Sequence, residues 1–332
     1  MGLQLKRAIA VVMRTKPYVL YRALIYGALC LCVIGYLGLL AIIGLVFGAG
    51  AFWALLVVSV GLVAMLGVVG FVGEYIFYRL RAGHIALITE IIAEGQLPTG
   101  ISQMKWARGR VLHYFGSVSP LPQVLWLVRA IVRAANRTLF DSAAALPVPG
   151  IECGTKFSQH LVDFSQGYVE EALIAYVFKS KEDNLFAAAQ AGLVAYCQSW
   201  KTVLGNAVML TLWSYCFVLL ATVLFLIPLG IVAWILPAEW TIFKFTLFAT
   251  GVFLGFAAKW SLYDPVASAS TILAFLEESD LTTPEPEWEP KLESACEAFG
   301  ELKRKAEDQA AGSKTKKPSK RPRTKRPPAV RL

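Results

Sequence analysis

Residues 23–73 decide the fold, and they read ALIYGALCLCVIGYLGLLAIIGLVFGAGAFWALLVVSVGLVAMLGVVGFVG. This run of 51 residues contains no charged side chain, and a second uncharged run of 37 residues covers 202–238. About 20 apolar residues at ~1.5 Å each cross the ~30 Å hydrocarbon layer of a bilayer, so the first run is long enough for two crossings and a turn. The pattern predicts an all-α, polytopic integral membrane protein.

The two uncharged runs predict two transmembrane helical hairpins, and therefore four spans. In the first hairpin we expect helices over 23–47 and 52–78, joined by a glycine-rich turn. In the second hairpin we expect a helix from Val203 to Leu236 and a last helix from Phe243 to Tyr263. Pro228 should break or kink the longer of these, because proline removes a backbone donor and clashes with the preceding turn.

Around the hairpins the chain divides by composition into segments of different character. These are a basic N-terminal segment (1–22), the first hairpin (23–78), an amphipathic helical region (79–201), the second hairpin (202–263), an acidic proline-rich segment with a soluble helix (264–309), and a disordered polybasic tail (310–332). Arg22 precedes the first hairpin, and Arg79 and Arg81 follow it, so the positive-inside rule places both termini in the cytosol. The apolar run after Arg22 is too long for a signal-peptide core, so the first crossing should be retained in a plasma or inner membrane.

Glycines punctuate the first hairpin. Gly44 and Gly48 form a Gly-x-x-x-Gly pair, and Gly67, Gly70 and Gly73 recur every three residues. Small residues let membrane helices approach closely. The spacing favours a close-packed hairpin, with a homo-oligomer through these glycines as the alternative.

The net charge of +9 resides entirely in the tail. From Ser313 onward there are nine cations and no acid, and removing these nine from the 32 Lys and Arg leaves 23, which equals the number of Asp and Glu. The cations are Lys314, Lys316, Lys317, Lys320, Arg321, Arg323, Lys325, Arg326 and Arg331. We expect the tail to bind anionic lipid or an acidic protein partner. Nucleic-acid binding and a nuclear targeting signal are the less favoured alternatives.

Residues 121–140 predict a basic amphipathic helix. Arg129, Arg133 and Arg137 recur every four residues and share one face, while apolar residues and Trp126 supply the other. Such a helix is typical of the membrane interface against anionic lipid. The alternative is a helix whose apolar side packs on a neighbour and whose basic side is solvated.

Two further helices should precede the second hairpin. One is expected from Phe157 to about Lys179, and the next is capped by Asp183 or Asn184. The second of them carries stripes of alanine and Gly192 that suit tight helix contact. Both helices are expected to be interfacial or partly embedded.

No catalytic, metal or cofactor motif is present in the sequence. The six cysteines form no Cys-x-x-Cys pair and the three histidines are scattered, so neither a metal nor another cofactor is predicted. Without a nucleophile–base pair or a phosphate-binding loop, we do not expect an enzyme.

Charged and polar residues at the spans are the candidate site, because bilayer-embedded charges are costly. Glu74 and Lys259 each lie about one turn from the cytosolic end of a span, and Asp264 follows the last helix. A Glu74–Lys259 pair would link the hairpins, with independent snorkelling of the two side chains as the alternative. Asn206 would line a polar track or bond within its own helix.

Two segments resemble the choline transporter-like family. YDPVASASTILAFLEE (263–278) is similar to the exit of that family's last helix, and YVEEALIAY (168–176) is similar to its penultimate segment. The resemblance covers a quarter to a third of the chain. That family has about ten crossings and a large extracellular loop, which this sequence lacks. The resemblance implies a shared C-terminal architecture and transport of a small organic cation.

Two functional hypotheses follow. The first is a transporter-like protein for a small organic cation or amphiphile, with a path between the hairpins bordered by Glu74, Asn206 and Lys259. The second is a membrane scaffold that docks an acidic partner or anionic lipid through the basic helix and the polybasic tail.

Overall fold

The computed structural model describes residues 4–46, 51–97, 100–115, 121–141, 156–238, 240–281 and 287–315. All regular structure in these residues is helical, which confirms the all-α prediction. The helices are α1 (Leu5–Arg14), α2 (Lys16–Val46), α3 (Ala51–Glu94), α4 (Gln103–Phe115), α5 (Leu121–Asp141), α6 (Lys156–Ser180), α7 (Leu185–Ile235), α8 (Thr241–Ala258), the π turn η1 (Lys259–Tyr263), α9 (Asp264–Leu281), α10 (Trp288–Ala295) and α11 (Glu297–Thr315).

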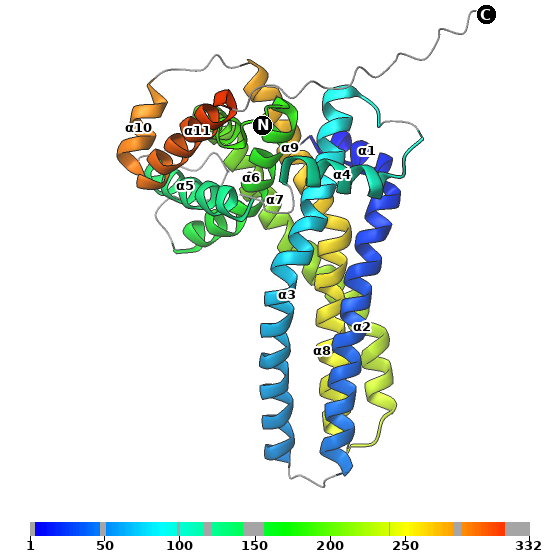
Figure 1. Ribbon diagram of the computed structural model, residues 1–332. Coiled ribbons are helices and arrows are strands. Elements are labelled where there is room, and N and C mark those ends of the chain that lie inside the picture. The colour runs from blue at the N-terminus through cyan, green and yellow to red at the C-terminus, as the bar shows by residue number, and fades with distance from the viewer. Residues whose placement is uncertain are drawn as a thin grey trace, which may run out of the picture.

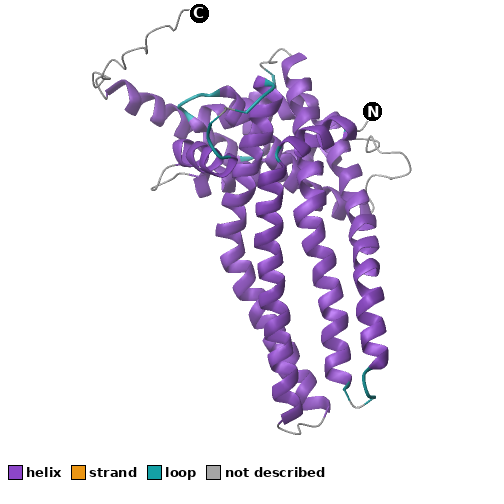
Figure 2. Cartoon of the chain, turned by 90° about the vertical axis from the view of Figure 1, so that its right-hand side faces the viewer, coloured by secondary structure: helices purple, strands orange, loops and turns teal. Residues whose placement is uncertain are grey.

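The long helices α2, α3, α7 and α8 run side by side as a bundle, and the shorter helices gather at one end of it (Figure 1). We call that end the head end and the opposite one the distal end. Both α1 and α11 lie at the head end. The long helices also run side by side, away from the head, in the view turned by 90° (Figure 2). Consecutive long helices turn back at the distal end, so the chain forms two hairpins whose free ends all enter the head.

Three helical segments are long and apolar enough to cross a membrane. They are Lys16–Tyr36, Leu185–Ile235 and Phe243–Leu281. The remaining expected span, 52–78, lies within α3, where most side chains are outside the described residues. The length and hydropathy of the three segments make a membrane location plausible.

Several helices are longer than expected. The helix predicted before residue 200 and the span after it form one helix, α7, which Asn184 caps by accepting a hydrogen bond from the backbone N–H of Ala187. Pro228 lies inside α7, which continues to Ile235, so of the break or kink expected there the break is wrong and the kink stays a prediction. A proline costs one backbone hydrogen bond, which a helix already held by its neighbours tolerates.

The last span does not end at Tyr263 as expected. Helix α8 passes through the π turn into α9, and the N–H of Asp264 bonds the carbonyl of Lys259, five residues earlier. In an α-helix the ring of Pro265 would clash with the carbonyl four residues before it. The wider π turn shifts the carbonyls that precede this proline, so the helix continues into the head.

The head has its own apolar core, formed mainly by α5, α6, α7, α9 and α11. Leu193 and Val203 of α7 and Ile272 of α9 are inaccessible to solvent there. The predicted close contact of the alanine and glycine surface of α7 is present, because a Cβ on Gly192 would lie 3.0 Å from Cδ1 of Tyr176.

Two glycines outside the expected set make close contacts in the bundle. Gly251 and Gly255 of α8 abut Leu226 and Thr222 of α7, while Gly67 has nothing within 4 Å of its added Cβ. Gly48 lies outside the described residues. The surroundings of Gly44, Gly70 and Gly73 are also outside them.

Candidate functional site

Polar side chains converge where the bundle meets the head. Trp240 lies next to the distal end of the bundle, and Trp260 lies where the bundle meets the head. They are roughly 20 residues apart in the sequence and therefore about 30 Å apart along a helix. That length equals one hydrocarbon thickness, and tryptophan favours the membrane–water boundary. The polar cluster lies at the level of Trp260, and we call it the junction network, made up of Arg22, Arg81, His84, Tyr168, Glu171, Lys259, Asp264 and Ser268.

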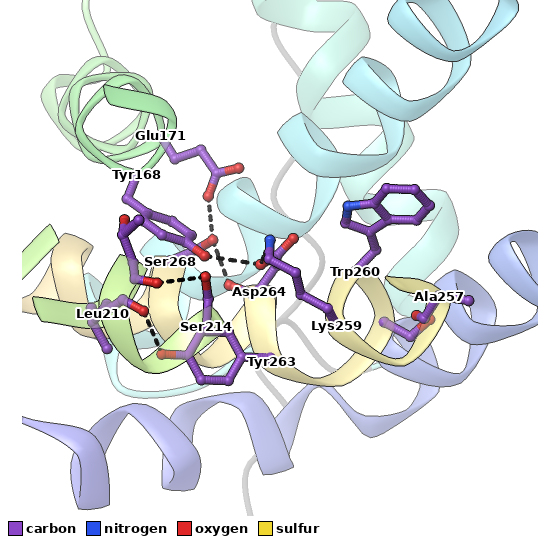
Figure 3. Close-up of polar contacts among 12 residues, drawn as sticks. Tyr168, Glu171, Leu210, Ser214, Ala257, Lys259, Trp260, Tyr263, Asp264 and Ser268 are labelled. Carbon is purple, nitrogen blue, oxygen red and sulfur yellow. Dashed lines mark hydrogen bonds and ion pairs between the residues drawn. The ribbon is translucent and has the colours of Figure 1, made fainter. Parts of the chain in front are cut away.

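The first part of the junction network surrounds the π turn (Figure 3). Lys259 Nζ lies 2.7 Å from Asp264 Oδ1, and the hydroxyl of Tyr168 donates to the same oxygen at 2.9 Å. Both members of the ion pair are mostly buried, with side-chain exposures of 20% for Lys259 and 15% for Asp264. Lys259 and Asp264 are only five residues apart in the sequence, but the hydrogen bond from Tyr168 connects this pair to α6.

The second part is built around Glu171 of α6 (Figure 3). The hydroxyl of Ser268 lies within hydrogen-bond distance of the Glu171 carboxyl group and of the carbonyl of Asp264, and its single hydrogen is shared between these acceptors. Burial raises the pKa of the Glu171 carboxyl, and Arg81 is the strongest opposing influence on that pKa. Arg81 in turn donates to Tyr26 of α2. Four helices, α2, α3, α6 and α9, are thereby linked through charge.

The third part is centred on His84, which is 1% exposed. One ring nitrogen lies 2.9 Å from the hydroxyl of Thr15, and the other lies 3.1 Å from a guanidinium nitrogen of Arg22. Arg22, only 3% exposed, also donates to the carbonyl of Trp260 at 2.9 Å. Burial, and then the charge of Arg22, lower the pKa of His84 well below its usual value of 6.5. The imidazole is therefore neutral and accepts from Arg22.

The candidate residues from the sequence meet only in part. Lys259 pairs with Asp264, and the side chain of Glu74 is outside the described residues, so the Glu74–Lys259 pair stays a prediction. Asn206 reaches from α7 to α9, where its amide donates to the hydroxyl of Thr271 at 3.5 Å. It lies deeper in the head than the π turn and does not contact the junction network.

The basic helix α5 is packed into the head. Leu127, Ile131 and Val132 on its apolar face are inaccessible to solvent, against α6, α7 and α11. Protein therefore covers these three residues, whereas Trp126 on the same helix is 63% exposed and is not covered. The alternative of a packed helix with a solvated basic side fits the structure.

The cations on α5 differ in their surroundings. Arg129 Nε lies 2.8 Å from Glu170 Oε2, whereas Arg133 is exposed and makes no hydrogen bond or ion pair with a described residue. The side chain of Arg137 is outside the described residues. So are the tail cations Lys316, Lys317, Lys320, Arg321, Arg323, Lys325 and Arg326. Contact of these cations with lipid or a partner stays a prediction.

Sequence reasoning missed most of the junction network. In the sequence, Arg22 serves only as a topology signal, and no local pattern singles out Glu171 or His84. The available signal was that Arg22 directly borders the longest uncharged run, where a cation needs a partner. His84 and Glu171 carry no comparable signal, because their burial depends on how α3 and α6 pack.

The chemistry of the network is that of charge pairing. The described members include three cations, Arg22, Arg81 and Lys259, and two carboxylates, Glu171 and Asp264. With His84 neutral, these side chains sum to one positive charge. Among the described residues no group of three or more His, Cys, Asp or Glu could hold a metal ion.

Comparison with protein families, with curated proteins and with solved structures found no match to this chain. The resemblance to the choline transporter-like family therefore depends on the two quoted segments alone. Those two segments contact each other, through Tyr168 with Asp264 and through Glu171 with Ser268.

Proposed function

We propose that this protein is a four-span membrane scaffold whose helical head and basic tail dock an acidic protein partner. The spans are α2, the first part of α3, the second half of α7, and α8, with the head and both termini in the cytosol. This topology is supported by the two hairpins, in which α2 ends and α3 begins at the distal end, as α7 ends and α8 begins there (Figure 1). It is also supported by the cations that flank the hairpins on the head side.

The position of the charges favours a scaffold over a transporter. Transporters bind their substrates near the middle of the bilayer, where helices are interrupted. Here the junction network lies at the head end, and closer to the distal end α8 packs tightly on α7 at Gly251 and Gly255. The described charges in the network bond one another, as expected of a structural connection between bundle and head.

The observation that carries the proposal is the orientation of α5. Its apolar face is buried in the head, so its basic side points outward and exposes Arg133. Lys156, at the start of α6, is likewise exposed without a hydrogen bond or ion pair to a described residue. Helix α11 ends the described chain, and the tail cations that follow it in the sequence are the second basic element of this proposal.

Tail removal tests the scaffold directly. A chain that ends at Thr315 keeps all of α11 and loses residues 316–332. Purified in gentle detergent at low salt, the intact protein should retain an acidic protein, identifiable by mass spectrometry, and the shortened protein should lose it. Adding Arg133→Gln should weaken binding of the acidic protein further, because the contacts of the tail and of Arg133 with it are both electrostatic. Both should weaken as salt is added.

The control is the double variant Lys259→Met with Asp264→Leu, which removes both charges of this buried pair and leaves neither unpaired. It should leave the partner bound as long as the protein folds. If Lys259→Met or Glu74→Gln abolishes the biological activity while the shortened chain is fully active, the scaffold proposal is wrong.

A second candidate is the handling of a small organic cation at the junction network. The observation that favours it is the contact between the two segments that resemble the choline transporter-like family. Aromatic rings also gather there, with the rings of Tyr26 and Trp260 5.7 Å apart, as in sites for quaternary ammonium groups. The net positive charge of the described network opposes this candidate.

Uptake into proteoliposomes separates the two candidates. A transporter should accumulate labelled choline or a related quaternary amine, and Asp264→Asn should stop uptake without releasing any protein partner. Absence of uptake by the folded wild-type protein would exclude choline as the substrate.

A further inference from the structure

Two stretches of the chain carry cations and no acid. Residues 1–73 contain no Asp or Glu, and neither do residues 95–140. Helix α1 lies in the first stretch and α4 in the second. Both helices therefore carry positive charge that no acid on the same element offsets.

The structure brings these two helices together at the head end of the bundle. The side-chain amide of Gln103, the first residue of α4, donates to the carbonyl of Arg14, the last residue of α1, at 3.0 Å. Further along α4, Ala107 packs at Gly83 beside Tyr18. Figure 1 shows α4 lying across the upper parts of α2 and α3.

This position coincides with the end of the apolar bundle. Tyr18 and Gly83 neighbour the Arg22–His84 contact, which is at the level of Trp260. That level is about one hydrocarbon thickness from Trp240 at the distal end. Helix α4 and the corner between α1 and α2 thus lie where lipid headgroups would surround the protein.

The outer surface of these elements is both apolar and cationic. Ile9 and Met13 of α1 are 44% and 52% exposed, and Met104 and Leu112 of α4 are 41% and 43% exposed. The exposed cations that make no side-chain hydrogen bond or ion pair with a described residue are Lys6, Lys16, Lys105 and Arg108. This combination is typical of helices that lie in the interface of an anionic bilayer.

We propose that α1, the corner at Lys16 and α4 form a collar that binds the headgroups of anionic phospholipids on the head side. The cations contact lipid phosphates, and the exposed apolar side chains enter the boundary of the acyl chains. The occupant is a bilayer and not an acidic protein because the charge lies at the edge of the spanning bundle, among uncovered apolar side chains. The collar shares no residue with the docking surface proposed above.

The test uses the full-length protein in a neutral detergent. Phosphatidylglycerol or phosphatidylcholine is titrated in, and the rise in melting temperature gives an apparent affinity for each lipid. The collar variant combines Lys16→Gln, Lys105→Gln and Arg108→Gln. Each cation near an anionic surface contributes about fivefold in binding, so affinity for phosphatidylglycerol should fall at least about tenfold, while affinity for phosphatidylcholine is unchanged.

The matched control removes three exposed cations of the head, through Arg133→Gln, Lys156→Gln and Arg304→Gln. It changes the net charge equally and should alter the phosphatidylglycerol affinity less than about twofold. Lys16→Arg with Lys105→Arg should retain wild-type affinity, which separates loss of charge from loss of folding. All these proteins keep the basic tail, so any lipid binding by the tail contributes equally to each measured affinity.

Three results would overturn the collar. One is equal binding of the two lipids by the wild-type protein, and another is an equal loss in the collar and control variants. The third is a collar variant that keeps its lipid affinity but binds poly-L-glutamate more weakly than the wild type and the control variant do, which would assign the surface to an acidic polypeptide. The proposed scaffold is tested by loss of its partner on tail removal, so the two proposals can fail separately.

Discussion

The apolar part of the helical bundle and its junction with the head are held together in different ways. Within the apolar part, α8 packs on α7 through glycine, with an added Cβ on Gly255 only 3.1 Å from the backbone Cα of Thr222. At the head end, the same helical rod is joined to α2 and α6 by charged and hydroxyl groups, including Arg22, Tyr168 and Asp264.

The difference follows from the solvent at each level. In hydrocarbon, water exclusion does not drive helices together, so close approach and dispersion must hold them, and glycine permits both. At the boundary with water, charged groups cost less to place and give directional contacts between helices. The apolar part of the bundle is therefore expected to depend on shape, and the junction on charge pairing.

The largest expected effect is the loss of one partner in the buried ion pair of the junction. Asp264→Asn leaves Lys259 without its counter-ion and weakens the contact with Tyr168, at a cost of about 3 kcal/mol in the free energy of unfolding. Thermal unfolding in detergent measures it. The double variant Lys259→Met with Asp264→Leu should recover much of the loss, since no unpaired charge remains. A double variant less stable than Asp264→Asn would contradict this account.

The next effect tests the glycine contact. Gly255→Ala places a methyl group against Thr222, which overpacks the α7–α8 contact and should cost about 2 kcal/mol. The control is Gly230→Ala, because an added Cβ there has nothing within 4 Å. It should be neutral or stabilising by up to about 1 kcal/mol through helix propensity. Equal melting temperatures for the two variants would show that α7 and α8 are not closely packed at Gly255.

The stability contributed by the junction should depend on pH, because the junction contains the titratable side chain of His84. The described glycine contacts between α7 and α8 involve no titratable group. The pKa of His84 is lowered by burial and by Arg22, so the unfolded chain binds a proton more readily than the folded one. The contribution to stability is complete above pH 6.5 and is lost as the pH falls below it, by up to about 1.4 kcal/mol per pH unit.

His84→Gln is the variant for this measurement. Melting temperatures of the wild type and of the variant should converge between pH 7 and pH 5, because only the wild type loses this contribution. If the difference between the two proteins does not change with pH, His84 does not titrate in this way.

The smallest effect is expected on the surface of the head. Arg129 is 49% exposed in its ion pair with Glu170, so Arg129→Gln should cost less than about 1 kcal/mol, and the cost should shrink in high salt. A salt titration of the melting temperatures of both proteins measures it. A loss as large as that of Asp264→Asn would mean that the head depends on surface charge as much as the junction does.

Much of the architecture was predictable from local patterns. The absence of charge over residues 23–73 predicted paired helices, the cap at Asn184 was identified, and the alanine and glycine surface at Gly192 was recognised as a contact. Helix ends were less predictable. Neither Pro228 nor Pro265 stops its helix, because neighbouring helices and the π turn compensate for the missing hydrogen bond.

The candidate site was predicted only as separate residues. Lys259 and Asp264 were both selected from the sequence, but their pairing depends on the π turn, and their link to α6 depends on Tyr168. The basic face of α5 was also identified. Whether its apolar side lay in lipid or in protein was decided by α6, α7 and α11, which are distant in sequence.

The sequence by itself determined that long, uncharged helices fold back in pairs, since hydrophobic length and the absence of charge are local properties of the chain. Only the tertiary structure decided which charges meet, because residues as far apart as Arg22, His84 and Trp260 become neighbours through helix packing. A buried charge requires a partner, and the identity of that partner depends on contacts between helices that no local pattern specifies.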